Sequence, residues 1–142
     1  MKSLQQLCAA KGGQIHTIGP DAKVIEALKL MSEKDIGALL VVDGERLIGI
    51  LSERDYARKV ILQGRSSQDI SVSDIMTADV VTVDPNRTVE ACMSVMTQRR
   101  VRHLPICEGD KLVGLVSIGD LVKEVIAEQE QTIKQLESYI HS

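Results

Sequence analysis

The chain has 142 residues, a formal net charge of −3 and 44% hydrophobic residues. This length predicts one compact domain or two very small halves that share a core, and the hydrophobic fraction is typical of a soluble globular protein. A mildly acidic charge disfavours general nucleic-acid binding. The absence of Trp and Phe, with only two Tyr, also argues against base stacking on aromatic platforms.

The N-terminus and the cysteines indicate a cytoplasmic protein without a membrane segment. The stretch MKSLQQLCAAKGG lacks the unbroken apolar core of a signal peptide, and no apolar run approaches the roughly 18 residues of a membrane helix. Cys8, Cys92 and Cys107 are odd in number and show no C-x-x-C spacing. We therefore expect reduced thiols, two of them buried.

The sequence repeats itself with an offset of 65 residues (85 − 20, for example), and no gap is needed between residues 17 and 61 of the first copy. Each copy ends in an apolar run, a serine and an aspartate three residues later: LIGILSERD in the first and LVGLVSIGD in the second. Such internal similarity predicts two copies of one supersecondary unit. The matched pairs include Pro20 and Pro85, Gly49 and Gly114, Ser52 and Ser117, and Asp55 and Asp120.

Each copy begins with a predicted strand, at residues 15–18 or 80–83. A helix follows a proline, with Asp21 or Asn86 as its expected N-cap, because apolar residues then recur at helical spacing from Val24 or Val89. The continuous apolar runs ALLVV and LPIC predict the next strand, which ends at a tight turn with Asp-Gly or Glu-Gly.

The runs LIGIL and LVGLV predict a further strand, and a second helix begins near Asp55 or Asp120. The fold class is therefore α/β (α+β), with tandem β-α-β-β-α repeats. Strands this continuously apolar are expected to be covered by helices on both faces. Since one unit could hardly bury its own sheet, we expect the two to pack around a pseudo-twofold axis.

We divide the chain into an N-terminal segment with the first repeat (1–62), a polar, flexible linker (63–74), and the second repeat with a long C-terminal helix (75–142). That helix carries an apolar stripe between residues 122 and 140. The stripe needs a partner, which is either its own domain or another chain.

The Ser-x-x-Asp of each copy falls between a buried strand and a helix N-terminus. Backbone N–H groups at a helix start favour phosphate, and a carboxylate there can accept hydrogen bonds from the two hydroxyls of a ribose. The alternative is that each motif only caps its own helix. Cationic residues nearby suit phosphate. The candidates are Lys23 near a helix start, Arg54 within the first motif, and Arg102 and His103 just before a strand.

This ordered, duplicated set of features resembles a pair of CBS domains, also called a Bateman module, of the stand-alone bacterial type. The resemblance rests on the endings GILSERD and GLVSIGD, the segment RVRHLPIC, and DIMT just before the second unit. It implies an adenine-nucleotide sensor that binds AMP, ADP, ATP, NAD or S-adenosylmethionine in two clefts, with the aspartates holding the ribose hydroxyls.

The resemblance implies that each cleft mixes residues of both units, with strand backbone meeting the adenine edge and aliphatic side chains covering its faces. One cleft would join Ser52, Arg54 and Asp55 with Met76, Thr77, Val80, His103 and Pro105. The other would join Ser117 and Asp120 with Gly13, Ile15, Thr17, Ala38 and Leu39. Because the first set holds more cationic groups, we expect it to prefer the more highly phosphorylated or dinucleotide ligand.

We expect no metal site and no catalytic cofactor, because His103 and Cys107 alone do not make a metal site and no Ser/His/Asp or Cys/His set stands out. The leading hypothesis is a ligand-responsive regulator that signals through a homodimer or an effector protein. A structural dimerisation module with empty clefts and a nucleotide-hydrolysing enzyme are the two alternatives.

Overall fold

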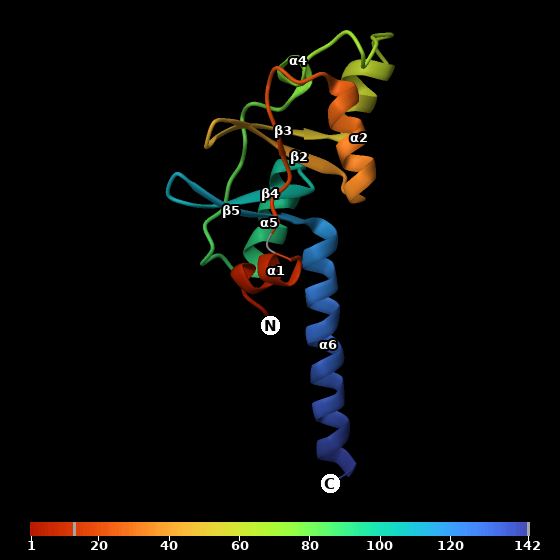
Figure 1. Cartoon of the computed structure of the whole chain (residues 1–142). Helices are drawn as coiled ribbons and strands as arrows, with labels where there is room; N and C mark the ends of the chain where they lie inside the picture. The colour runs from red at the N-terminus through yellow and green to blue at the C-terminus, as the bar shows by residue number, and fades with distance from the viewer. Residues whose placement is uncertain (13, 142) are drawn as a thin grey trace. The chain divides into compact units, whose positions relative to one another are not determined.

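The structure is a computed structural model that describes residues 1–12 and 14–141 (Figure 1). In chain order its elements are α1 (Leu4–Ala10), β1 (Thr17–Ile18), α2 (Val24–Lys34), β2 (Ala38–Asp43), β3 (Arg46–Ser52), α3 (Glu53–Tyr56), the π-helix η1 (Ala57–Ile61), α4 (Val72–Ile75), α5 (Val89–Arg99), β4 (His103–Glu108), β5 (Lys111–Ser117) and α6 (Ile118–His141). The first repeat has the predicted β-α-β-β-α order, and the second repeat has the same order without the first strand. Among the described residues, none of the helices combines the length and the hydropathy that a membrane span requires.

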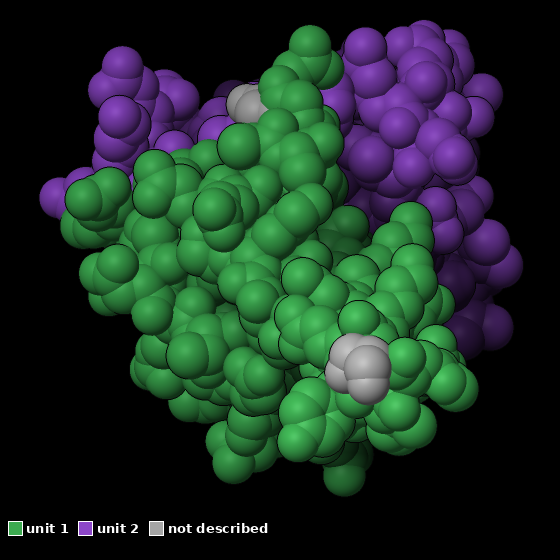
Figure 2. Space-filling model, turned by 90° about the horizontal axis from the view of Figure 1, so that it is seen from below, with its two compact units in different colours: residues 1–14, 82–109, 113–142 green, residues 15–81, 110–112 purple. Residues whose placement is uncertain are grey.

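The chain forms two compact units (Figure 2). Unit 1 comprises residues 1–14, 82–109 and 113–142, and unit 2 comprises residues 15–81 and 110–112. Unit 2 therefore holds the first repeat together with the segment that follows it. Unit 1 combines most of the second repeat with the N-terminal segment, which the sequence division had grouped with the first repeat.

The two units contain equivalent sheets of different size. In unit 2, β1 runs parallel to β2, and β2 pairs antiparallel with β3. In unit 1, β4 and β5 form a two-stranded sheet, and a single parallel bridge from Val83 to Ile106 replaces the first strand. The predicted strands at 15–18 and 80–83 are therefore too long, since they shrink to two residues and to one bridge.

The cores are aliphatic, as the composition predicts. In unit 2 the core consists of Val24, Ala27, Met31, Leu39, Val41, Leu51, Val60, Ile70, Val72 and Ile75. The hydrophobic residues buried in unit 1 include Leu4, Leu7, Cys8, Val83, Val89, Cys92, Met96, Leu104, Ile106, Val116 and Leu121.

The predicted N-caps of α2 and α5 are wrong by two residues. The caps are Lys23, without a side-chain hydrogen bond, and Thr88, whose Oγ1 accepts from the Ala91 N–H at 3.0 Å. Asp21 and Asn86 instead lie in turns that follow the prolines, so each helix starts one short turn later than expected.

The segment 63–74 is not a flexible linker. The Val24 N–H donates to the Ile70 carbonyl at 3.0 Å, and the Ile25 N–H donates to the Ser67 carbonyl at 3.0 Å. Ile70 and Val72 are buried in the core of unit 2. The few apolar residues within this polar stretch are enough to fix it, because burying each of them stabilises the fold by roughly 1.5–3 kcal/mol.

The helices α1 and α4 are also related by the 65-residue offset, and each packs on the repeat that it does not precede. Met76, which directly follows α4, lies beside Gly49 of β3 in unit 2. Cys8 of α1 lies beside Gly114 of β5 in unit 1, where a Cβ would stand 2.5 Å from the cysteine Sγ. The paired glycines therefore leave the space in which these exchanged segments pack.

Gly114→Ala should lower the free energy of unfolding by about 1–3 kcal/mol, because the new methyl group overlaps Cys8. Cys8→Ala in the same chain should recover part of that loss, since it removes the nearest atom. Gly119→Ala is a matched control, because its Cβ would meet nothing closer than 3.6 Å. Urea denaturation measures all three, and a Gly114→Ala variant as stable as the unaltered chain would contradict this packing.

Candidate functional site

Each Ser-x-x-Asp lies where a central strand ends and a helix begins. Ser52 is the last residue of β3 and Asp55 lies in α3, while Ser117 is the last residue of β5 and Asp120 lies in the first turn of α6. The apolar strand before each serine is half to fully buried, so the junction is held in place by the core.

Both carboxylates cap their own helices. Asp55 Oδ2 accepts from the Ser52 N–H at 2.9 Å, and the Asp55 N–H donates to Ser52 Oγ at 3.2 Å. Asp120 Oδ2 accepts from the Ser117 N–H at 2.8 Å, and the Asp120 N–H donates to Ser117 Oγ at 3.1 Å. The capping role considered from the sequence is therefore present in both copies, and it fixes the orientation of both side chains.

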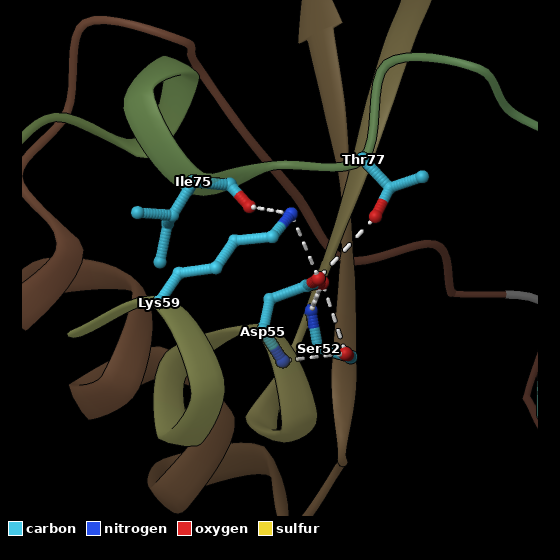
Figure 3. A network of polar contacts seen from close by, with 5 residues as sticks. All are labelled: Ser52, Asp55, Lys59, Ile75 and Thr77. Carbon is cyan, nitrogen blue, oxygen red and sulfur yellow. Dashed lines mark hydrogen bonds and ion pairs between the residues drawn. The ribbon is translucent and has the colours of Figure 1, made fainter. Parts of the chain in front are cut away.

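Capping occupies only one oxygen of Asp55. Its Oδ1 accepts from Thr77 Oγ1 at 3.3 Å and lies 3.3 Å from the Lys59 ammonium (Figure 3). Thr77 is held there because its backbone exchanges two hydrogen bonds with Ile50 of β3. We call Ser52, Asp55, Lys59 and Thr77 the Asp55 site. Since a carboxylate offers about four acceptor positions over its two oxygens, a ligand hydroxyl at Oδ1 would compete with Thr77 and Lys59.

Asp120 has a different cationic partner. The Lys11 ammonium donates to Asp120 Oδ2 at 2.7 Å and to the Leu115 carbonyl at 3.1 Å. Among the hydrogen bonds of the described residues, all those made by the Asp120 carboxylate fall on Oδ2, which leaves Oδ1 open. We call Lys11, Ser117 and Asp120 the Asp120 site.

The ionised form of Asp120 is favoured. Burial alone would raise the pKa of this carboxyl, but hydrogen bonds from Lys11 and Ser117 and the charge of Lys11 outweigh burial and lower the pKa. The side chain is 22% exposed, so the carboxylate is partly shielded from water without being sealed off.

His103 stands at the start of β4 in the same unit as Asp120. Burial lowers the pKa of its imidazole, the positive charge of Lys11 lowers it further, and Asp120 acts in the opposite direction. His103 is therefore neutral near pH 7 and can donate or accept a hydrogen bond. The neighbouring Arg102 has an exposed side chain, and its carbonyl accepts from the Ile118 N–H at 2.9 Å.

The structure brings together only part of the predicted set. Asp55 contacts both Ser52 and Thr77, Met76 precedes Thr77 and lies beside Gly49, and Ser117 contacts Asp120. Arg54 and Lys23 are exposed, and Gly13 lies outside the described residues. Ile15, Thr17 and Val80 are half-buried, and Ala38, Leu39 and Pro105 are buried within strands, so the last three offer backbone groups more readily than side chains.

The predicted pairing of residues across the two repeats stays a prediction. Thr17, Ala38 and Leu39 share unit 2 with Asp55, whereas His103 and Pro105 share unit 1 with Asp120. Each expected cleft therefore draws on both units.

Sequence reasoning missed the two lysines. Lys59 follows Asp55 by four residues on the same helical segment, a spacing that favours an ion pair and is visible in the sequence. Lys11 carries no such signal, because 109 residues separate it from Asp120. Only the repeat offset points to it, since Lys11 occupies the position of Met76 in the other copy (76 − 65 = 11).

The cysteines are free thiols, and the described residues give no sign of a metal site. All three cysteines are free, with Cys8 and Cys92 buried, as predicted, and burial raises the pKa of each thiol. Within residues 1–12 and 14–141, no three His, Cys, Asp or Glu side chains are placed to hold a metal ion. A shallow groove between α2 and α3 contains none of the predicted site residues.

Asp120→Asn should destabilise the chain at pH 7 by on the order of 1 kcal/mol, because it weakens the ion pair with Lys11. The folded pKa of Asp120 lies below the unfolded value, so the stabilisation is complete above about pH 3.9 and is lost as the pH falls through the folded pKa. Unfolding curves between pH 2 and pH 7 (about the range over which carboxyls titrate) should therefore converge for the two proteins in acid. Asp79→Asn, at an exposed position, is the control, and parallel curves for Asp120→Asn would contradict the assignment.

The comparisons with known proteins agree with the duplicated fold. A model of the CBS domain matches the chain twice, over residues 13–61 and 72–127. The mitochondrial CBS domain-containing protein CBSX3 of Arabidopsis thaliana is 42% identical over 125 residues, which make up 84% of this chain and 61% of that protein. This chain therefore spans less than two thirds of that relative's length.

Two solved structures are also similar. A protein of Burkholderia ambifaria MC40-6, provisionally described as a signal-transduction protein with CBS domains, is 53% identical with a TM-score of 0.86, covering 90% of this chain and 96% of that one. A hexameric CBS-CP12 protein from bloom-forming cyanobacteria is 30% identical with a TM-score of 0.76, covering 85% of this chain and 66% of that one. The two family matches span both repeats, and the chain therefore belongs to the CBS domain family and carries a pair of CBS domains.

Proposed function

We propose that this chain is a regulatory module that binds an adenine nucleotide, such as AMP, ATP or NAD, through the Asp55 and Asp120 sites. The observation that carries the proposal is the state of the two carboxylates. In each, one oxygen is fixed by the helix it caps, and the other is not used by the cap. Membership of the CBS family and the similarity to a protein described as signalling support a regulatory role.

A fixed carboxylate suits the recognition of a ribose. Two vicinal hydroxyls donate hydrogen bonds to one carboxylate, and such charge-assisted bonds are about twice as strong as neutral ones. Because the cap prevents rotation of Asp55, little side-chain entropy is lost on binding. The lysine beside each carboxylate would supply a positive charge for a phosphate of the same ligand.

Lys59 and Lys11 give the proposal a route from binding to signal. Lys59 contacts both Asp55 and the Ile75 carbonyl at the end of α4. Lys11, at the end of α1, donates to the Asp120 carboxylate and to the Leu115 carbonyl of β5. A phosphate that attracts either ammonium must compete with these contacts. Ligand binding would then shift the segments that precede each repeat, which a second copy or an effector protein could read.

Nucleotide hydrolysis is the weaker alternative. Among the described residues, no three His, Cys, Asp or Glu side chains are placed to hold a metal ion that would assist it. Prolonged incubation with ATP or NAD followed by chromatography tests it directly, since the binding proposal expects the nucleotide to be recovered intact. A structural module with empty sites is the other alternative, and flat melting curves with every nucleotide would favour it.

Adenine nucleotides should raise the melting temperature of the chain. A ligand that binds only the folded state stabilises it by RT ln(1 + [L]/Kd), about 2.7 kcal/mol at a hundredfold excess over Kd. A thermal-shift series with AMP, ATP and NAD, and with GMP for comparison, measures this. Unchanged melting at millimolar concentrations of all the adenine nucleotides would contradict the proposal.

The sugar diol should carry much of the affinity. We expect 2′-deoxy-AMP to bind about tenfold more weakly than AMP, because it loses one charge-assisted hydrogen bond. Asp55→Asn should weaken AMP binding at that site to a similar extent and reduce the preference for AMP over the deoxy form. Isothermal titration calorimetry measures both effects.

Asp74→Asn is the matched control, because Asp74 caps α4 through the same kind of box with Ser71, and among the described residues the hydrogen bonds and ion pairs of Asp55 do not include Asp74. If Asp74→Asn and Asp55→Asn weakened AMP equally, loss of a cap rather than loss of a ribose contact would be the cause. That result would count against the assignment of Asp55.

A further inference from the structure

The helix α6 carries an apolar stripe that the chain leaves exposed. Val122, Ile126, Ile133, Leu136 and Ile140 are between 39% and 73% exposed. Figure 1 shows the C-terminal half of α6 extending beyond α1, α5 and β5 of its own unit. A run of exposed large aliphatic side chains on one helix face marks an interaction surface.

The stripe repeats with the period of a coiled coil. Ile126, Ile133 and Ile140 are spaced seven residues apart. Val122, Gln129 and Leu136 form a second series with the same spacing, in which Gln129 follows Ile126 by three residues. These are the a and d positions of a heptad, which lie along one seam when two helices pack. One member, Gln129, is polar, and a polar residue in such a seam lowers its stability while favouring one register.

The chain's own fold uses another face of α6. Leu121 and Glu124 are the buried residues of this helix. The Lys2 N–H donates to Glu124 Oε1 at 2.7 Å, and the N-terminal ammonium pairs with Glu128 Oε2 at 2.9 Å. The N-terminus therefore covers the face that carries Glu124 and Glu128, while the stripe faces elsewhere. The sequence left two partners open for the stripe, its own domain or another chain, and the domain itself does not cover the stripe.

We propose that the stripe binds the same stripe of a second copy of this chain, as an antiparallel two-helix coiled coil. With the helices centred on Gln131, every a residue faces a d residue. Val122 then meets the partner's Ile140, Ile126 meets the partner's Leu136, and Gln129 meets the partner's Ile133. The seam is self-complementary over 19 residues, from Val122 to Ile140, or about 28 Å of helix.

The flanking charges favour the antiparallel order. In this register Lys123 lies opposite the partner's Glu137. The twofold symmetry repeats this attraction, so the dimer gains two such ion pairs. The only like-charge contact at these flanking positions is between the two copies of Glu130. In a parallel coil, the flanking positions instead pair Val125 with Glu130 and Thr132 with Glu137, which offers no opposite charges. Lys123, Glu130 and Glu137 are all exposed and are therefore available for this contact.

This proposal does not depend on nucleotide binding, although it gives the proposed regulator a contact between copies. Asp120 caps the start of the helix that carries the seam. One continuous helix therefore connects the Asp120 site with the surface that would join two chains.

Ile133→Glu should at least halve the assembled mass measured by sedimentation velocity at micromolar concentration, because it places charges at the middle of the seam. The far-ultraviolet circular dichroism and the melting curve of the folded units should show whether the variant folds. Gln131→Glu, on the opposite side of the same exposed helix, is the matched control and should assemble like the unaltered chain. A chain that is monomeric without any substitution, or an Ile133→Glu variant with unchanged mass, would overturn the proposal.

Cysteine cross-linking reads the orientation. In the antiparallel register, a chain with both Ile126→Cys and Leu136→Cys should form interchain disulfides under mild oxidation, while neither single variant should cross-link. Within one chain these positions are about 15 Å apart, too far for a disulfide. Efficient cross-linking of both single variants would show a parallel coil and overturn the antiparallel assignment, and no cross-link in any variant would overturn the seam itself.

Discussion

The arrangement of both sites depends on one interaction, the reciprocal cap between a strand-ending serine and the aspartate three residues later. The serine hydroxyl accepts from the aspartate N–H, and the aspartate carboxylate accepts from the serine N–H. This satisfies backbone donors that the helix start would otherwise leave without partners. It also fixes each carboxylate at the end of a buried strand. Helix capping is therefore compatible with the proposed ligand recognition, because the backbone cap uses only one oxygen of each carboxylate.

The second constraint is the exchange of the segments that precede the repeats. The segment around α4 brings Thr77 to Asp55, and the segment after α1 brings Lys11 to Asp120. Gly49 and Gly114 leave the space in which Met76 and Cys8 pack. Each site therefore joins residues that are far apart in the chain, and its geometry depends on packing that a single repeat could not supply alone.

Most of the fold was predictable from the sequence because the repeat doubles every local signal. The strands β2 to β5, the turns at Gly44 and Gly109, and both Ser-x-x-Asp junctions follow from apolar runs and turn residues. The helix caps were misplaced because a proline turn separates Asp21 and Asn86 from the helices. The segment 63–74 was misjudged because its polar composition hides Ile70 and Val72, whose burial fixes it. At the site, Lys11 could not be found from local spacing, since tertiary packing alone brings it to Asp120.

The two sites share a frame but differ in chemistry. The carboxylate of Asp55 meets a threonine hydroxyl and Lys59, whereas that of Asp120 meets Lys11. A crystal structure of the chain grown with excess AMP tests the central claim most directly. The account predicts ribose hydroxyls about 3 Å from an oxygen of Asp55 or Asp120, with both serine caps intact. A structure in which AMP binds elsewhere, or in which both carboxylates contact only their own helices, would contradict it.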